Sequence, residues 1–262
     1  MVFNLKKNTV LVIVFTVLAA SLLLLLMTYD YLLHERTNTL STYPSENNVV
    51  RRALLVDGLS VIYPGDYFIN VAKNILEESG FTVDVVQGGN VTVVFLLGLK
   101  RYDIIVLRLH SAISIDGELY LFTGEPYNEN DYFALKLTGV VARGEARFEN
   151  KTYFALNARF LGRDSALNLT GSIVILMGCV GTEDQVFIDY LLGKGVSAYI
   201  AWDGYVSVEH SDKATLELIK AFVRNGFNLE EAVDKVMETI GPDPVYNARL
   251  RLYSSQKRGS QS

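Results

Sequence analysis

Two residues with reactive side chains stand at the ends of two apolar, strand-like runs. The segment DIIVLRLH (103–110) ends at His110, and IVILMGC (173–179) ends at Cys179, the one cysteine among 262 residues. In a parallel sheet, residues just past the carboxyl ends of strands line the ligand crevice. Consecutive strands are commonly neighbours, so the two side chains are expected across one crevice. A thiol and an imidazole placed in this way are the parts of a cysteine nucleophile and its base.

The residues around Cys179 favour a reactive site. Gly178 and Gly181 flank the cysteine and allow a tight turn with close substrate approach. A helix is expected to follow, and the partial positive charge of its N-terminus favours a thiolate. The competing interpretation is structural, because a lone cysteine is usually a small buried hydrophobe and a histidine at a strand end is often only hydrogen-bonded.

The elements that must position this pair alternate between strand-like and helix-like patterns. This alternation predicts an α/β fold, a three-layer sandwich in which helices cover a mostly parallel sheet. The strands are expected at 52–57, 81–86, 103–110, 173–179 and 197–202. Helices are expected at 67–79, at 91–98, from Thr182 as the cap to about 193, at 211–225 and at 229–240.

Helix ends are marked by capping residues. Asp66 is expected to cap the helix over 67–79, which Gly80 ends. Thr182 and Gln185 have the spacing of a capping box, as do Asn228 and Glu231.

The region 111–172 interrupts the alternation. It is rich in Tyr, Phe, Gly and Asn and predicts hairpins at 118–123 and at 146–148 with 152–156, inserted at the edge that carries His110 and Cys179. Residues 246–262 are polar at their end and are expected to fray.

The N-terminus predicts a membrane anchor. No charge occurs between Lys7 and Asp30, a stretch long enough to cross a hydrocarbon core of about 30 Å. A cleaved signal peptide is the alternative, but this run exceeds the usual apolar region of about 7–15 residues and no small-x-small cleavage site follows. The expected parts are a short cytoplasmic segment (1–8), a transmembrane signal anchor (9–28), a juxtamembrane linker (29–49), the α/β domain (50–245) and a polar tail (246–262).

The expected orientation places the C-terminal domain on the extracytoplasmic side of the cell membrane. Lys6 and Lys7 precede the apolar span, which weakly favours a cytoplasmic N-terminus. Sequons at Asn90, Asn150 and Asn168 agree with this orientation, although such triplets also arise by chance.

Composition excludes several classes of function. The net charge of −5 gives no electrostatic footprint for nucleic acid. One cysteine allows neither an intrachain disulfide nor a cysteine-based zinc cluster, and the three histidines have no metal-ligand spacing. No metal and no cofactor are therefore expected.

The order of these motifs resembles the caspase-like cysteine peptidases, the clan of caspases, metacaspases, gingipains, separases and CHAT domains. A strand with His and a small residue is followed by a strand with Gly-Cys-x-Gly, a helix, a strand with Trp, and a long helix. The segment AYIAWDGYVSVEHSDKATLELIKAFVRNGFNLEEAVDKV (198–236) is similar to the C-terminal half of CHAT domains. The likeness covers roughly residues 51–240 in topology, through short motifs.

The resemblance implies roles for individual residues. Cys179 would be the nucleophile and His110 the general acid/base, with the backbone N–H groups of Cys179 and Ser111 stabilising the oxyanion. Two positions depart from the family pattern: Ser111 stands where Gly usually follows the His, and Gly178 where Ala or Ser often precedes the Cys. A side chain at 111 could narrow the oxyanion site.

The resemblance also suggests a substrate preference. Caspases have Trp-Arg after the fifth strand, where the Arg helps to bind an acidic P1 side chain, and this chain has Trp202-Asp203. Asp57, at the end of the first strand, is expected to point to the same edge. Two carboxylates would favour Arg or Lys at P1, as in metacaspases and gingipains, although Asp-Gly at both places is also ordinary turn chemistry.

The sequence therefore predicts a membrane-anchored, outward-facing cysteine endopeptidase or amide hydrolase that acts on a peptide or protein substrate. Two alternatives remain. One is a catalytically inactive, caspase-like recognition or sensor module, which Ser111 and the aromatic-rich insertion favour. The other is a flavodoxin-like domain of unrelated function, with Cys179 buried and His110 structural.

Overall fold

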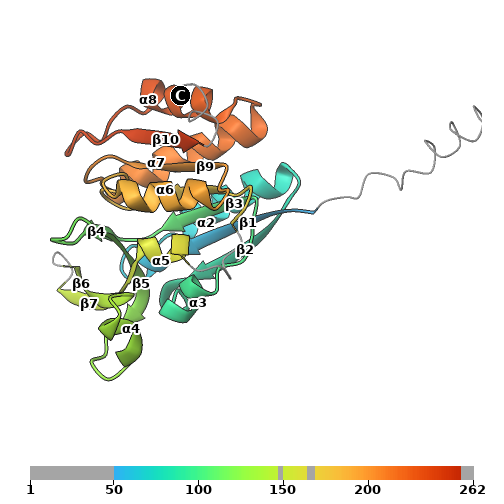
Figure 1. Cartoon of the computed structure of the whole chain (residues 1–262). Helices are drawn as coiled ribbons and strands as arrows, with labels where there is room; N and C mark the ends of the chain where they lie inside the picture. The colour runs from blue at the N-terminus through green and yellow to red at the C-terminus, as the bar shows by residue number, and fades with distance from the viewer. Residues whose placement is uncertain (1–49, 147–149, 164–168, 255–262) are drawn as a thin grey trace, which may run out of the picture. The chain divides into compact units, whose positions relative to one another are not determined.

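The computed structural model describes residues 50–146, 150–163 and 169–254. It is a mixed α/β fold with two sheets (Figure 1). The predicted membrane anchor at 9–28 lies outside the described residues. Within the described residues, no helix combines the length and apolar character needed to cross a membrane.

The larger sheet, sheet A, has six strands in the order β10-β9-β8-β3-β1-β2. All neighbouring pairs are parallel except β9 and β10. Its strands are β1 (Arg51–Asp57), β2 (Phe81–Gln87), β3 (Ile104–Arg108), β8 (Ile173–Leu176), β9 (Ala198–Trp202) and β10 (Leu250–Ser254). The five parallel strands match the apolar runs of the sequence, so this part of the prediction is confirmed.

Helices cover both faces of sheet A (Figure 1). Alternate residues of a strand point to opposite faces, and in β1 Leu54 enters one core while Leu55 enters the other. This two-sided burial explains the nearly continuous apolar runs. The helices of one face are α2 (Asp66–Glu78), α7 (Val208–Ile219) and α8 (Leu229–Thr239), and those of the other are α3 (Val93–Leu97), α5 (Ala158–Arg163) and α6 (Gln185–Gly193).

Short turns complete the connections. Two 3-10 turns follow the first two strands, and a π-helical turn continues α7: η1 (Gly58–Val61), η2 (Gly88–Asn90) and η4 (Lys220–Arg224). The capping box of Asn228 and Glu231 at α8 is confirmed. The predicted cap of α2 is wrong, because the helix begins at Asp66 and Gly65 occupies the cap position.

The insertion forms a second, antiparallel sheet, sheet B, in the order β4-β5-β7-β6. It lies beyond the carboxyl ends of β1 and β3 (Figure 1). Its strands are β4 (Ser111–Ile113), β5 (Leu119–Pro126), β6 (Val141–Ala146) and β7 (Lys151–Asn157), with the short helix α4 (Phe133–Leu137) between β5 and β6. The insertion forms hairpins as predicted, but residues 119–123 belong to the single strand β5, whose hairpin partner is β4. In the other hairpin the first strand, β6, begins earlier than expected, at Val141, and the predicted strand residues 147–148 lie outside the described residues.

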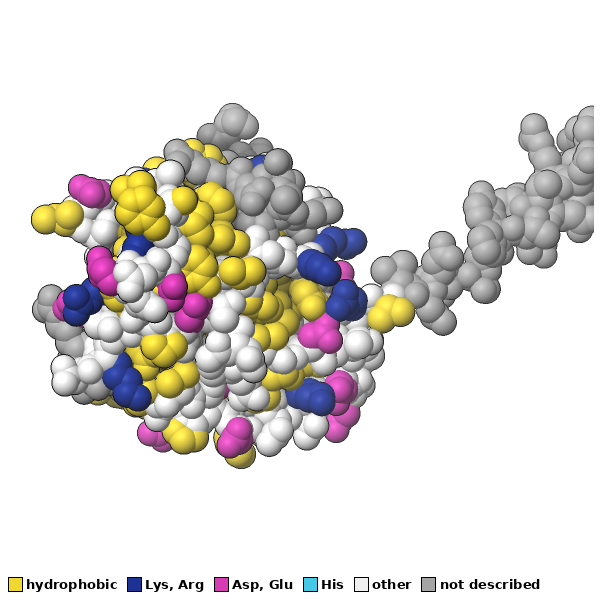
Figure 2. Space-filling view, turned by 90° about the horizontal axis from the view of Figure 1, so that it is seen from below, with side chains coloured by type: hydrophobic (Ala, Val, Ile, Leu, Met, Phe, Trp, Pro, Cys, Tyr) yellow, Lys and Arg dark blue, Asp and Glu magenta, His cyan; other side chains and the backbone are white. Residues whose placement is uncertain are grey.

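One face of the molecule exposes apolar side chains between charged ones. Figure 2 shows this face from below, the side on which α3 and α4 lie in Figure 1. The large exposed apolar residues of these two helices are Val94, Phe133 and Leu137.

The C-terminal boundary differs from the prediction. Residues 250–254 form β10, which pairs with β9 at the edge of sheet A, instead of belonging to a fraying tail. Leu250 is buried in the core that also contains Trp202. The folded domain therefore continues past residue 245, at least to Ser254.

Candidate functional site

The structure places His110 and Cys179 at matching heights beyond two adjacent strands. Leu107 of β3 pairs with Leu176 of β8, and the N–H of Met177 donates to the carbonyl of Leu107 (2.9 Å). His110 and Cys179 each follow their paired leucine by three residues. The adjacency of the two strands, predicted from their order in the chain, is confirmed.

The two segments beyond these strands touch. A Cβ atom on Gly178 would lie 2.1 Å from the Ser111 hydroxyl oxygen and 2.7 Å from the carbonyl oxygen of Leu109. The Ser111 hydroxyl donates to the carbonyl of Cys179 at 2.6 Å. A glycine at 178 is therefore needed, because any side chain would push the histidine segment away from the cysteine segment.

His110 and Cys179 both line one small hollow between sheet A and the start of α7. Its volume, including space open to solvent, is about 280 Å³, and the enclosed part is much smaller than the usual small-molecule site. The other lining residues are Leu59, Arg108, Leu109, Met177, Gly178, Val206, Val208, Ser211 and Asp212.

The Cys179 thiol is held against the backbone of Val206. The N–H of Val206 lies 3.5 Å from Sγ, and Sγ lies 3.7 Å from the carbonyl oxygen of the same residue. Burial raises the pKa of Cys179, the Val206 N–H partly opposes this shift, and the carboxylate of Asp243 adds to it. The resting side chain at neutral pH is therefore the thiol.

The prediction that the N-terminus of the next helix stabilises a Cys179 thiolate is wrong, because that helix begins too far from the cysteine. Helix α6 begins only at Gln185, and its N-terminus is capped by the Asp184 carboxylate, which accepts from the N–H of Phe187. The predicted capping role of Thr182 is also wrong. Five residues, one of them the negatively charged Asp184, separate Cys179 from the first residue of the helix, while the dipole effect falls off within about one turn.

A strained residue follows the cysteine. Val180 has φ +51°, a left-handed conformation that is unfavourable for a β-branched side chain. Its N–H donates to the carbonyl of Gly204 at 2.8 Å, and its side chain is buried. Such strain persists only where the surroundings enforce it, and it clusters at functional sites.

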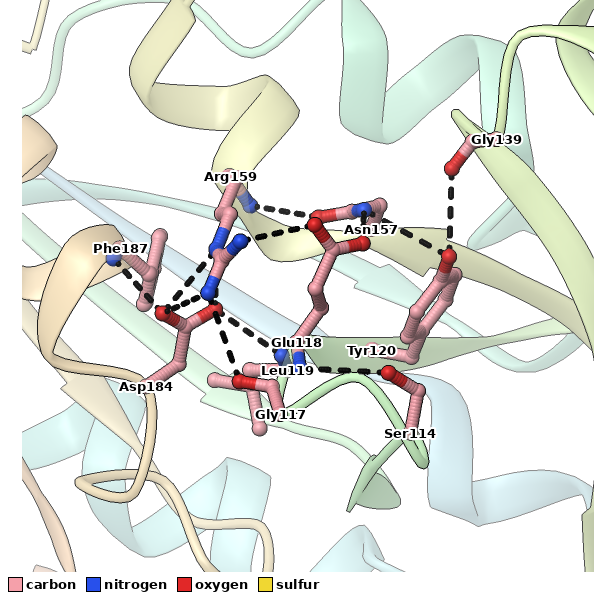
Figure 3. Close-up of polar contacts among 10 residues, drawn as sticks. All are labelled: Ser114, Gly117, Glu118, Leu119, Tyr120, Gly139, Asn157, Arg159, Asp184 and Phe187. Atoms are coloured by element: carbon pink, nitrogen blue, oxygen red, sulfur yellow. Dashed lines mark hydrogen bonds and ion pairs between the residues drawn. The ribbon is translucent and has the colours of Figure 1, made fainter.

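Asp184 fixes the far end of the Cys179 loop (Figure 3). Its carboxylate is fully buried and accepts from Arg159 and from the N–H of Leu119 in β5. Burial acts to raise the pKa of Asp184, but the bonds from Arg159 and the backbone lower it overall. Arg159 also pairs with Glu118 (2.7 Å), so this cluster joins the loop to sheet B.

The His110 ring lies between two aromatic rings. Its centroid is 6.1 Å from that of Tyr63 and 6.1 Å from that of Phe122, both in edge-on geometry. The backbone N–H of Phe122 donates to the His110 carbonyl at 2.8 Å. The imidazole is thus positioned by η1 and its following turn on one side and by β5 on the other.

Asp57 is not available to a substrate, in contrast to the predicted role. Its side chain is fully buried and accepts from Arg108 Nη1 at 2.7 Å. Arg108 also pairs with Asp212 of α7 through Nε (2.8 Å) and Nη2 (3.0 Å). These ion pairs explain a charged residue inside a buried strand.

Asp203 is also engaged elsewhere. It accepts from the N–H of Arg249 (2.6 Å) and from the Arg251 side chain (2.7 Å), and so joins β9 to β10. Neither Asp203 nor Asp57 is among the residues that line the hollow. The two carboxylates are therefore not brought together as the expected pocket.

Two residues that contribute to the site, Val206 and Asp243, were not predicted from the sequence. Val206 acts through its backbone and has no sequence signal. Asp243 accepts from the hydroxyl and the N–H (2.9 Å) of Ser207 and from the N–H groups of Val245 (2.9 Å) and Tyr246 (2.8 Å). Burial acts to raise its pKa, but these bonds, the one from the Ser207 hydroxyl most strongly, lower it to about 2. Its position between two prolines, in Pro-Asp-Pro, was the available signal for such a turn.

Comparison with known proteins leaves the resemblance to caspase-like peptidases as a prediction. No protein-family model and no curated protein matches the sequence. Within the described ranges, no three His, Cys, Asp or Glu side chains converge in a way that could hold a metal ion. The argument for function therefore depends on the geometry around Cys179 and His110.

Proposed function

We propose that this protein is a cysteine endopeptidase or amide hydrolase of caspase-like topology, with Cys179 as nucleophile and His110 as general acid/base. One observation carries the proposal: His110 and Cys179, from the ends of adjacent parallel strands, line the same hollow. This edge of a parallel sheet is where ligands bind in open α/β folds. The glycine contact at 178 and the strained Val180 add support, since both constrain the cysteine turn.

The chemistry follows from the protonation state of the pair. Because burial raises the pKa of Cys179, its proton leaves during attack, passing to His110 as Sγ bonds to the substrate carbonyl carbon. The backbone N–H groups of Cys179 and Ser111 stabilise the oxyanion. His110 then gives the proton to the departing amine, and water hydrolyses the thioester to regenerate the thiol.

The proposal includes the membrane anchor at residues 9–28. The charge-free segment supports a single-pass protein of the cell membrane, with the catalytic domain on the extracytoplasmic side. Its substrate is a peptide or protein that reaches this side of the membrane.

A thiol-directed peptidyl probe tests the dyad. We expect labelling of the wild-type protein, none of Cys179→Ala, and labelling of His110→Ala slowed by about 10²-fold or more, because the base is lost. Equal labelling of His110→Ala and wild type would disprove the dyad. Circular dichroism of both variants controls for folding.

A second function is favoured by the environment of the thiol. The contacts of Sγ with Val206 and the raised pKa suit an inactive recognition module as well as a resting enzyme. This alternative predicts that peptidyl probes leave Cys179 unlabelled, while peptide binding in the hollow is the same in Cys179→Ala and wild type. Rapid, His110-dependent labelling would exclude it.

A further inference from the structure

The charged side chains Asp57, Arg108 and Asp212 are already paired with one another inside the protein. Arg108 is almost completely buried and donates through Nε and Nη2 to Asp212, and through Nη1 to Asp57 and the Tyr63 carbonyl. The pKa of Arg108 is raised: burial alone would lower it, but the bonds to Asp212 and Asp57 outweigh that effect. The guanidinium therefore stays charged and is committed to these partners.

Arg108 and Asp212, which both line the hollow, already pair with each other, so a charged substrate side chain would have to compete with this pair. Both oxygens of Asp212 already accept from Arg108, so a substrate cation would have to approach another cation to reach them. A substrate carboxylate would have to compete with Asp57 and Asp212 for Arg108. Burying a charge without a partner is strongly unfavourable.

The rest of the lining suits a small neutral group. Five of the lining side chains are aliphatic or thioether groups: Leu59, Leu109, Met177, Val206 and Val208. The Ser211 hydroxyl is engaged, since it donates to the Met177 carbonyl and accepts from the Trp202 indole (3.0 Å each). The space is smaller than most ligand sites.

We infer that the hollow accepts a small, uncharged substrate side chain, such as that of Ala or Val, next to the bond that Cys179 attacks. The inference rests on the proposed function and replaces the expected preference for Arg or Lys. The Asp57–Arg108–Asp212 cluster indicates that this substrate side chain is uncharged, and the small apolar hollow indicates its size.

Matched peptidyl probes that differ only at the residue beside the thiol-directed group test this inference on the full chain. We expect probes with Ala or Val to label Cys179 roughly tenfold or more faster than probes with Arg or Asp. Equal or faster labelling by the Arg or Asp probe overturns the inference but leaves the proposed function standing. Failure of every probe, while iodoacetamide still alkylates Cys179, overturns the proposed function and the inference together.

A variant of Val208, one of the apolar residues that line the hollow, provides a second test of the inference. Val208→Ala enlarges the hollow at the start of α7 and is expected to raise labelling by a Leu probe relative to an Ala probe several-fold. Val186→Ala, in the first turn of α6 and outside the lining, is the matched control with an unchanged ratio. An unchanged ratio in Val208→Ala as well contradicts the assignment of this hollow.

Discussion

At the scale of single residues, the site depends on a glycine that allows two chain segments to meet. Gly178 lies where a Cβ would overlap the Ser111 hydroxyl and the backbone carbonyl of Leu109. The hydroxyl could rotate away, but the carbonyl is part of the backbone. The contact between the segments that carry His110 and Cys179 therefore depends on backbone packing at Gly178.

Gly178→Ala is expected to lower the free energy of unfolding by about 1–3 kcal/mol, because the added methyl group overpacks the contact. Labelling of Cys179 by a peptidyl probe should fall at the same time. Urea unfolding measures the first effect. Gly193→Ala is the control, since nothing lies within 4 Å of its Cβ and it sits in α6; it should be neutral or stabilise by up to about 1 kcal/mol. Equal stabilities of the two variants would contradict the packing argument.

The rate at which the Cys179 thiol is alkylated is expected to depend on pH. Burial raises the pKa of Cys179, so the folded protein holds its proton to higher pH than the unfolded chain. The midpoint of iodoacetamide alkylation between about pH 6 and 10 should lie higher for the folded protein than in urea. Mass spectrometry of the alkylated peptide measures both. A folded midpoint at or below the unfolded one would indicate a thiolate–imidazolium pair instead.

At the scale of elements, the loops that hold the site are joined by buried carboxylates. Asp184 connects the end of the Cys179 loop to β5 and to Arg159 of α5. Asp243 connects the loop after β9, which contacts the thiol, to the loop before β10. These connections explain why the caps predicted from local sequence were partly wrong: Arg159 and Leu119 reach Asp184 from 25 and 65 residues away.

Arg159→Met is expected to destabilise the protein by about 3 kcal/mol, because it leaves a fully buried carboxylate without its cation. Arg143→Met is the matched control within sheet B. Its pair with Glu145 is exposed and 3.7 Å long, so the loss should stay within about 0.5 kcal/mol. Similar losses in the two variants, measured by urea unfolding, would show that the Asp184 cluster is not the connection described here.

Asp243 predicts how stability depends on acid. Its pKa is lowered from 3.8 to about 2 in the folded protein. A carboxylate with a lowered folded pKa stabilises above the unfolded pKa, and this stability is lost as pH falls through the folded value. The contribution is about 2 kcal/mol at neutral pH.

Asp243→Asn should therefore be less stable than wild type at pH 7, and the difference should shrink toward about pH 2. Thermal unfolding across this range measures both. Asp116→Asn, an exposed carboxylate in the turn before β5, makes the same change of charge without the buried hydrogen bonds and should have little effect. A difference that stays constant with pH would contradict the linkage.

At the scale of the whole molecule, the sequence predicted the strands, which follow from local apolar runs, better than the contacts between residues that lie far apart in the chain. The five parallel strands follow from apolar runs, and the adjacency of β3 and β8 follows from their order. The ion pair that neutralises Asp57 depends on its register opposite Arg108 and on Asp212 from a distant helix. The sequence around Arg108 does not show which carboxylates pair with it, because Asp57 and Asp212 come from other elements.

The missed strand at the C-terminus has a similar cause. Strand β10 alternates apolar and polar residues at the edge of the sheet, and its pattern, Leu-Arg-Leu-Tyr-Ser, resembles a solvated tail. Its stability comes from β9 and from the Arg251–Asp203 pair, neither of which is local. The position of the domain boundary can therefore be tested directly.

Shortening the full chain so that it ends at Ser254 should leave the stability of the domain unchanged. Ending it at Val245 should destabilise the domain by several kcal/mol, because it exposes the edge of β9 and removes the buried side chains of Ala248 and Leu250. It also removes the Tyr246 amide bond to Asp243 and so loosens the loop that carries Val206 against the Cys179 thiol. Burial raises the pKa of Cys179, so this pKa should fall when the thiol becomes solvated. Cys179 should then be alkylated faster in the shorter protein. Urea unfolding and alkylation rates of the two shortened proteins measure these effects, and equal values would place the boundary of the fold back at residue 245.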